Sequence, residues 1–127
     1  MIRSILHLRP APGRSRDLVR YIREEGIISR AVSLKGCLSA EVASSISVGE
    51  DVVVTALWKS IDDYDAWLAS PDRLRSGAGM LPLLNEAGDE VSGARLYDIE
   101  QADGRTDAVG SARDNISTRD VVGGAGQ

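Results

Sequence analysis

The apolar run Val52–Trp58 constrains the fold more than any other part of this 127-residue chain. The run is short and rich in β-branched residues, which predicts a strand. Alternate residues of a strand point to opposite faces of its sheet, and here both sets are mostly apolar. We therefore expect both faces to be covered, one by helices of the same chain and the other by a second copy of the chain.

The first half of the chain predicts the order strand, helix, strand. Apolar and polar residues alternate over Ile2–Arg9, which favours a strand that ends at the following proline. Ser15 is a predicted N-cap of a helix that extends to Val32, and Gly26 is expected to bend or break it. A second strand is predicted over Cys37–Ala43. Its apolar positions on one face are Leu38, Ala40 and Val42.

The second half predicts the order strand, helix, strand again. Ser60 is expected to cap a helix, and Ser70 to cap the segment that begins at Pro71. Gly77-Ala78-Gly79 and Pro82 predict a broken helix over Leu74–Leu84. The last strand is predicted over Val91–Glu100. The inward face of the helix that follows Ser60 is predicted to carry Ile61, Tyr64, Trp67 and Leu68.

This order of elements predicts an α+β fold of the ferredoxin-like split βαβ type, with helices on one face of a four-stranded antiparallel sheet. The predicted domain spans residues 1–100. Residues 101–127 are mixed Gly, Asp, Ser and Arg without apolar periodicity, which predicts a flexible tail.

Composition argues against several classes of protein. The net charge of −4 disfavours nucleic acid as a partner, because phosphate binding needs a basic face. No apolar run is long enough to span a membrane, and no secretion signal is expected at the N-terminus. The single Cys37 suits a reducing cytoplasm, so we expect a cytoplasmic protein. One histidine and one cysteine are too few soft ligands for a zinc or iron site.

Several segments resemble the antibiotic biosynthesis monooxygenase family of the dimeric α+β barrel superfamily. Pro12-Gly13 follows the first strand, and Lys35–Val42 is similar to the family's next turn and strand, with Lys35 in place of the usual proline. Thr55–Leu68 resembles the family's strand ending in Trp, followed by a Ser-capped helix with an aromatic residue six positions after the Trp. Ser70-Pro71 resembles the next turn. The resemblance covers about the first hundred residues.

This resemblance implies a homodimer in which two four-stranded sheets pack back to back, with a pocket between the sheet and helices of each subunit. It also implies oxidation of an aromatic polyketide or a related phenol or quinol to a quinone by molecular oxygen, without a metal or other cofactor. Such chemistry needs an apolar pocket, a donor for the developing oxyanion and a route for a proton.

The resemblance also implies candidate site residues. Trp58 is expected to stack on a flat substrate or donate its indole N–H, and Tyr64 to donate or relay a proton. Arg73 or Arg75 is expected to stabilise a phenolate. Trp58, Tyr64 and Arg73 are the predicted catalytic residues. Alternation places Val54, Ala56 and Trp58 on one face of their strand and Ser4, Leu6 and Leu8 on the matching face of the first strand, which would form a mostly aliphatic slot. The predicted substrate-binding residues are Ser4, Leu6, Val54, Ala56, Trp67 and Arg75.

The sequence also departs from the family. Members that form polyketide quinones carry an Asn where this chain has Val54, which cannot hydrogen-bond a substrate. A haem-degrading activity needs a His in the second helical region, where this chain has none. His7 is expected on the sheet face away from the helices, and Cys37 is expected to be a buried structural residue. A redox-neutral polyketide cyclase or isomerase, or a non-catalytic ligand-binding dimer, therefore remains an alternative.

Overall fold

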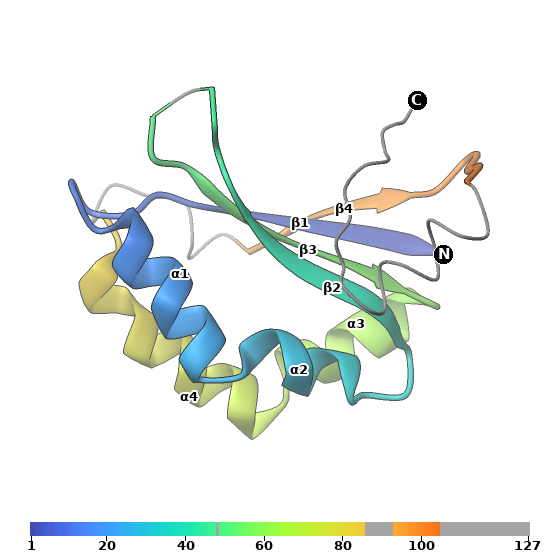
Figure 1. Cartoon of the computed structure of the whole chain (residues 1–127). Helices are drawn as coiled ribbons and strands as arrows, with labels where there is room; N and C mark the ends of the chain where they lie inside the picture. The colour runs from blue at the N-terminus through green and yellow to red at the C-terminus, as the bar shows by residue number, and fades with distance from the viewer. Residues whose placement is uncertain (48, 86–92, 105–127) are drawn as a thin grey trace.

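The computed structural model describes residues 1–47, 49–85 and 93–104 (Figure 1). Its strands form one antiparallel sheet with the order β2-β3-β1-β4, which confirms the predicted ferredoxin-like fold. Residues 91–92 of the predicted last strand and residues 105–127 of the predicted tail lie outside the described residues. The elements, in chain order, are β1 (Ile2–Leu8), α1 (Ser15–Glu24), α2 (Ile27–Val32), β2 (Cys37–Ser44), β3 (Val52–Trp58), α3 (Ile61–Leu68), α4 (Pro71–Met80), the 3₁₀ helix η1 (Leu81–Leu83) and β4 (Arg95–Asp98).

The four α-helices pack against one face of the sheet (Figure 1). The central strands β1 and β3 run antiparallel in register, with Leu6 opposite Val54 and Ser4 opposite Ala56. Directly opposed residues share a face, so the two strands present one continuous surface to the helices. Leu8 and Trp58, at opposite ends of this surface, are each only 1% exposed.

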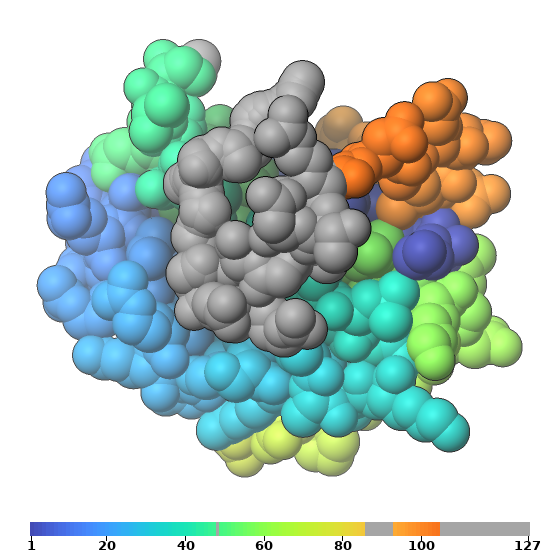
Figure 2. Space-filling model, turned by 45° about the vertical axis from the view of Figure 1, so that its right-hand side comes forward, coloured from blue at the N-terminus to red at the C-terminus, as the bar shows by residue number. Residues whose placement is uncertain are grey.

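The other face of β3 is only half covered within the single chain. Val53 and Leu57 are half-buried, as is Ile5 of β1, and Tyr97 of β4 is exposed. The hairpin between β2 and β3 stands clear of the body (Figure 2). Ile46, in this connection, is fully exposed. That a second copy covers this face stays a prediction.

Two of the three predicted helix caps are confirmed. The Ser60 hydroxyl oxygen accepts a hydrogen bond from the backbone N–H of Asp63, and Ser70 accepts one from Arg73 in the same way. The prediction for Ser15 is wrong, because this residue is the first of α1. The cap position is Arg14, whose side chain bonds instead to the Asp17 carboxylate at 2.6 Å.

The break at Gly26 is confirmed: its φ of +65° separates α1 from α2. The predicted break within Leu74–Leu84 is confirmed near Pro82, where α4 ends at Met80 and the 3₁₀ helix η1 follows, but it is wrong at Gly77–Gly79, because α4 continues through both glycines. Gly79 instead permits a close approach between helices, since a Cβ there would lie 2.2 Å from the hydroxyl oxygen of Tyr21. That hydroxyl donates to the carbonyl oxygen of Ser76 at 2.8 Å and fixes α4 against α1.

Two predictions of side-chain direction are also wrong. Leu38 is 42% exposed, because a β-bulge between Cys37 and Ser39 shifts the register of β2. Ile61 is 50% exposed, since it is the first residue of α3 and lies just beyond the end of β3. In the described part of the chain, no helix has the length and apolar character that a membrane span needs.

Candidate functional site

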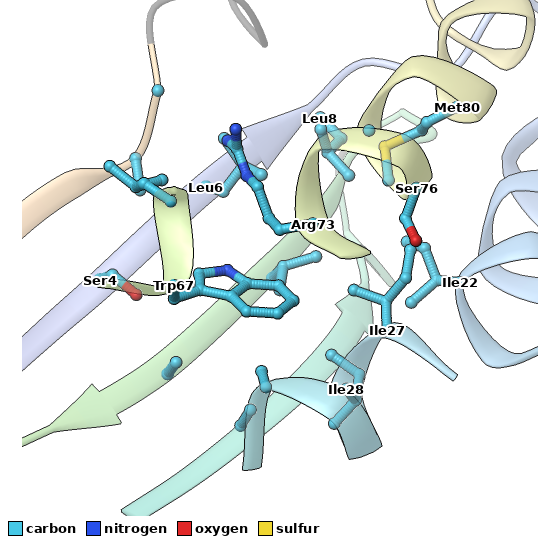
Figure 3. A pocket seen from close by; sticks show the side chains of 18 of the residues that line it. Ser4, Leu6, Leu8, Ile22, Ile27, Ile28, Trp67, Arg73, Ser76 and Met80 are labelled. Carbon is cyan, nitrogen blue, oxygen red and sulfur yellow. The ribbon is translucent and has the colours of Figure 1, made fainter. Parts of the chain in front are cut away.

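A cavity of about 360 Å³ lies between the helix-facing side of the sheet and the helices (Figure 3). Its volume falls within the range of about 300–1,000 Å³ that is typical of small-molecule sites. The wall is mostly apolar and is formed by residues of β1, β3 and all four α-helices. The lining residues include Ser4, Leu6, Leu8, Ile22, Ile27, Ile28, Val54, Ala56, Trp58, Tyr64, Trp67, Arg73, Ser76 and Met80.

One end of the cavity, here called the Trp58 end, is formed by Ser4, Trp58 and Tyr64. The indole N–H of Trp58 donates to the Ser4 hydroxyl oxygen at 3.0 Å, and both residues are buried. The Trp58 and Tyr64 rings meet edge to face, with centroids 5.6 Å apart and planes at 73°. Because Ser4 already accepts the indole hydrogen bond, Trp58 offers a ligand its ring rather than a free N–H.

Tyr64 is the buried phenol at this end. Burial raises its pKa above the ordinary value of 10.0, while the nearby Arg73 cation and a hydrogen bond with the Ala94 backbone act in the opposite direction. The phenol is therefore protonated at neutral pH. It can donate a hydrogen bond to a developing oxyanion, but it is not a base there.

The structure separates the two candidate arginines. Arg73 lines the cavity, and its guanidinium group lies on the cavity side of α4, near Leu6 in Figure 3. Arg75 is not among the cavity-lining residues, and its guanidinium group pairs with the Asp72 carboxylate at 3.0 Å on an exposed surface. Residues two apart on an α-helix point in directions about 200° apart, so Arg75 lies away from the cavity that Arg73 lines, and its predicted substrate-binding role does not fit this position.

The other predicted binding residues lie together on the cavity wall. Leu6, Val54 and Ala56 form an apolar floor on the two central strands. Trp67 projects from α3 into the middle of the lined region (Figure 3). Trp67 also packs against both groups of buried core residues, one that includes Leu8 and Ile22 and another that includes Trp58 and Tyr64. Their roles in binding stay predictions.

The opposite end, here called the Ser76 end, is formed by Leu8, Ile22, Ile27, Ser76 and Met80 (Figure 3). Of these, sequence reasoning placed only Leu8 in the predicted slot and missed Ile22, Ile27, Ser76 and Met80. A prediction of an unbroken helix would have placed Arg73, Ser76 and Met80 on one face, because Ser76 follows Arg73 by three residues and Met80 follows Ser76 by four. The predicted break at the glycines concealed that signal.

Two further residues considered from the sequence lie outside this cavity. His7 is exposed and lies opposite Val53, on the sheet face away from the helices as predicted. Cys37 is buried, and burial raises the pKa of its thiol, which keeps it protonated at neutral pH. Within the described ranges, no cluster of three or more His, Cys, Asp or Glu side chains is arranged to hold a metal ion.

Residues 1–76 match a family model described as antibiotic biosynthesis monooxygenase. No match is found among curated proteins.

Similar solved structures include a protein from Deinococcus radiodurans named after the same family, with a TM-score of 0.67 and 17% identity over 84% of this chain and 99% of the other. A protein from Chloroflexus aurantiacus, also named after the family, has a TM-score of 0.61 and 26% identity over 81% and 96% of the two chains. A mutant of SnoaB, a cofactor-independent oxygenase from Streptomyces nogalater, has a TM-score of 0.62 and 13% identity over 80% and 94%.

Proposed function

The chain belongs to the antibiotic biosynthesis monooxygenase family, and from this premise we propose that it oxidises a polycyclic phenol or quinol, such as an aromatic polyketide, to a quinone with molecular oxygen. One observation carries the proposal. A mostly aliphatic cavity has a buried phenol and a cation, Tyr64 and Arg73, on its wall. The name of SnoaB as a cofactor-independent oxygenase supports the further proposal that no cofactor takes part.

The proposed reaction begins with an electron-rich substrate in its ionised form. Loss of the phenolic proton leaves a phenolate, which the positive charge of Arg73 favours. The phenolate transfers one electron to oxygen, and the resulting substrate radical and superoxide combine into a peroxide. The peroxide takes up the proton that the phenol released, and the carbon that bears the peroxide then loses its hydrogen as a proton while the O–O bond breaks. One oxygen atom stays as the new quinone carbonyl, and the departing hydroxide combines with that second proton and leaves as water.

The protein residues supply the surroundings for this chemistry. Tyr64 is protonated and lies at the Trp58 end, where it can donate a hydrogen bond to the oxygen that gains negative charge. Leu6, Val54 and Ala56 exclude water from the substrate's flat face. The Trp58 ring provides a rigid aromatic surface, because its N–H is held by Ser4.

Oxygen uptake with anthrone and 1-naphthol, measured on protein treated with a metal chelator, tests the proposal. Wild-type protein is expected to exceed the spontaneous rate, and Tyr64→Phe to lower the turnover about tenfold or more, since it removes the donor. Tyr97→Phe is the matched control, because Tyr97 is an exposed phenol on the other strand face. Turnover equal to the spontaneous rate, or unchanged in the combined Trp58→Phe and Tyr64→Phe variant, contradicts the proposal.

A redox-neutral cyclase or isomerase is the second candidate, favoured by the apolar floor. Val54 lines the cavity opposite Leu6, so the central strands offer no polar side chain at that point to bind a substrate carbonyl. Turnover of a polyketide substrate under strict anaerobiosis would select this candidate over oxidation. Tight binding of a polycyclic product without any turnover would instead identify a non-catalytic binding protein.

We also propose that the active form is a homodimer in the cytoplasm. Val53 and Leu57 of β3 and Ile5 of β1 form a half-buried apolar patch on the face away from the helices, and burying it against a second copy would stabilise both chains. The free Cys37 suits a reducing compartment. Leu57→Arg is expected to convert a dimer at micromolar concentration to monomer in sedimentation velocity. A wild-type monomer under those conditions contradicts the homodimer.

A further inference from the structure

At the aliphatic end of the cavity, Ser76 carries a buried hydroxyl group without a hydrogen-bond partner. Its side chain is buried, with 3% exposure, and its hydroxyl group has no hydrogen-bond partner. Figure 3 shows the hydroxyl on the side of α4 that faces Ile22 and Ile27. A serine in a helix usually bonds to the carbonyl four residues earlier or points to solvent, and here it does neither.

A buried hydroxyl without a partner lowers stability, so its presence calls for an explanation. Replacing it with a methyl group would fill the same space among Ile22, Ile27 and Met80 without that cost. The retained hydroxyl is therefore suited to a ligand that enters the cavity and supplies the missing partner.

The position of Ser76 is fixed from outside the cavity. The Tyr21 hydroxyl donates to the backbone carbonyl of Ser76 at 2.8 Å, and the absence of a side chain at Gly79 lets the Tyr21 ring approach that closely. The Ser76 side chain thus projects from a helix that is held against α1. A fixed donor discriminates between ligands more strongly than a mobile one, because less ordering is required on binding.

Ser4, which belongs to the Trp58 end, and Ser76 lie on opposite sides of Trp67 in the close-up view (Figure 3). The Trp58 end carries Tyr64 as a neutral donor, and Arg73 supplies a cation on the cavity wall. The Ser76 end carries the Ser76 hydroxyl among aliphatic side chains. A flat ligand with a single polar group can satisfy one end only.

We propose that Ser76 is a specificity-determining residue that selects aromatic ligands with a second polar group, a hydroxyl or carbonyl, remote from the one bound at the Trp58 end. This inference rests on the proposed function only for the aromatic class of the ligand. Because Ser76 both donates and accepts, it accommodates either a phenol or a quinone carbonyl at this position.

Isothermal titration calorimetry without turnover tests this proposal. The probes are 1-naphthol, which has one hydroxyl, and 1,5-, 1,6- and 1,7-dihydroxynaphthalene, which carry a second hydroxyl on the other ring. Ser76→Ala is expected to weaken binding of at least one diol about tenfold while changing 1-naphthol less than about twofold. Ser29→Ala, the same change at an exposed position of α2, is the matched control and should alter neither.

A second variant separates the loss of the hydroxyl group from a general effect of the substitution on folding. Ser76→Cys keeps a weak donor of similar size, and its affinity for the selected diol should lie between those of wild type and Ser76→Ala. The proposal is overturned if Ser76→Ala affects every diol no more than 1-naphthol, or if wild-type protein binds none of the diols. Oxygen uptake is measured separately. A diol that binds through Ser76 but is not oxidised would contradict the proposed oxidation and would still support the role of Ser76 in selecting the ligand.

Discussion

At the Trp58 end of the cavity the Trp58 and Ser4 side chains bond to each other, whereas at the Ser76 end a hydroxyl faces aliphatic side chains without a partner. The Trp58 N–H and the Ser4 hydroxyl satisfy each other over 3.0 Å, and the pair helps to hold β1 and β3 together. Ser76 contributes no such bond in the free chain. The Trp58–Ser4 pair thus serves the fold, whereas the buried hydroxyl of Ser76 has no partner in the free chain and is available to a ligand.

The largest expected effect of a substitution is loss of stability at the Trp58 end. Trp58→Ala should lower the free energy of unfolding by about 3–5 kcal/mol, because it leaves a large void and removes the donor to buried Ser4. Urea denaturation measures it. Trp67→Ala, at a half-buried position, should cost less. If Trp58→Ala costs no more than Trp67→Ala, the Trp58 end is not the structural end of the cavity.

The cation between the two ends is expected to act on the charge of the ligand. Arg73→Met should weaken binding of an ionised naphthol about tenfold, because a hydrogen bond to a charged group is lost, and should change binding of the neutral form far less. Calorimetry below and above the pKa of the ligand separates the two forms. Arg75→Met is the matched control on the same helix. Equal losses in both variants would place the charge effect outside the cavity.

A smaller effect of opposite sign is expected at the Ser76 end. Ser76→Ala should raise the free energy of unfolding of the ligand-free protein by up to about 1 kcal/mol, because it removes a buried hydroxyl without a partner. Thermal and urea unfolding both measure the change. A destabilisation of similar size would mean that the hydroxyl is satisfied in solution and that the two ends do not differ as described.

The smallest expected effect is a loss of stability at high pH. Burial raises the pKa values of Cys37 and Tyr64 in the folded chain above their ordinary values of 9.0 and 10.0, so the folded state holds these protons more tightly than the unfolded state. This contribution is complete below about pH 9 and is lost as the pH rises through the folded-state pKa values. Tyr64→Phe should reduce the loss measured by denaturation between about pH 9 and about pH 11. An unchanged loss would show that Tyr64 is not the group responsible.

Much of the fold follows from local signals in the sequence. The strand β3 and the caps at Ser60 and Ser70 were predicted, since each depends on neighbouring residues only. The bulge at Cys37 and the continuity of α4 were not predicted, because they depend on contacts between distant segments. The approach of Tyr21 to Gly79 is such a contact, across more than fifty residues of chain.

The candidate site divides in the same way. Ser4, Val54 and Trp58 were predicted to line a cavity because alternation fixes which residues of adjacent strands share a face. The residues from α1 and α2 were missed, since the helix face that meets the cavity is set by packing. Ser76 was missed because the glycines that follow it indicated a break.

The central claim is that the cavity under the sheet binds a polycyclic aromatic ligand. Trp58 and Trp67 are the only tryptophans of the chain, and both line this cavity. Their two indole N–H signals in ¹H–¹⁵N NMR spectra, assigned with Trp58→Phe, can be followed during titration with 1-naphthol. The account predicts that both signals move and saturate together with binding. If binding leaves both indole signals in place and instead shifts the backbone amide signals of Val53 and Tyr97 on the other sheet face, the account is contradicted.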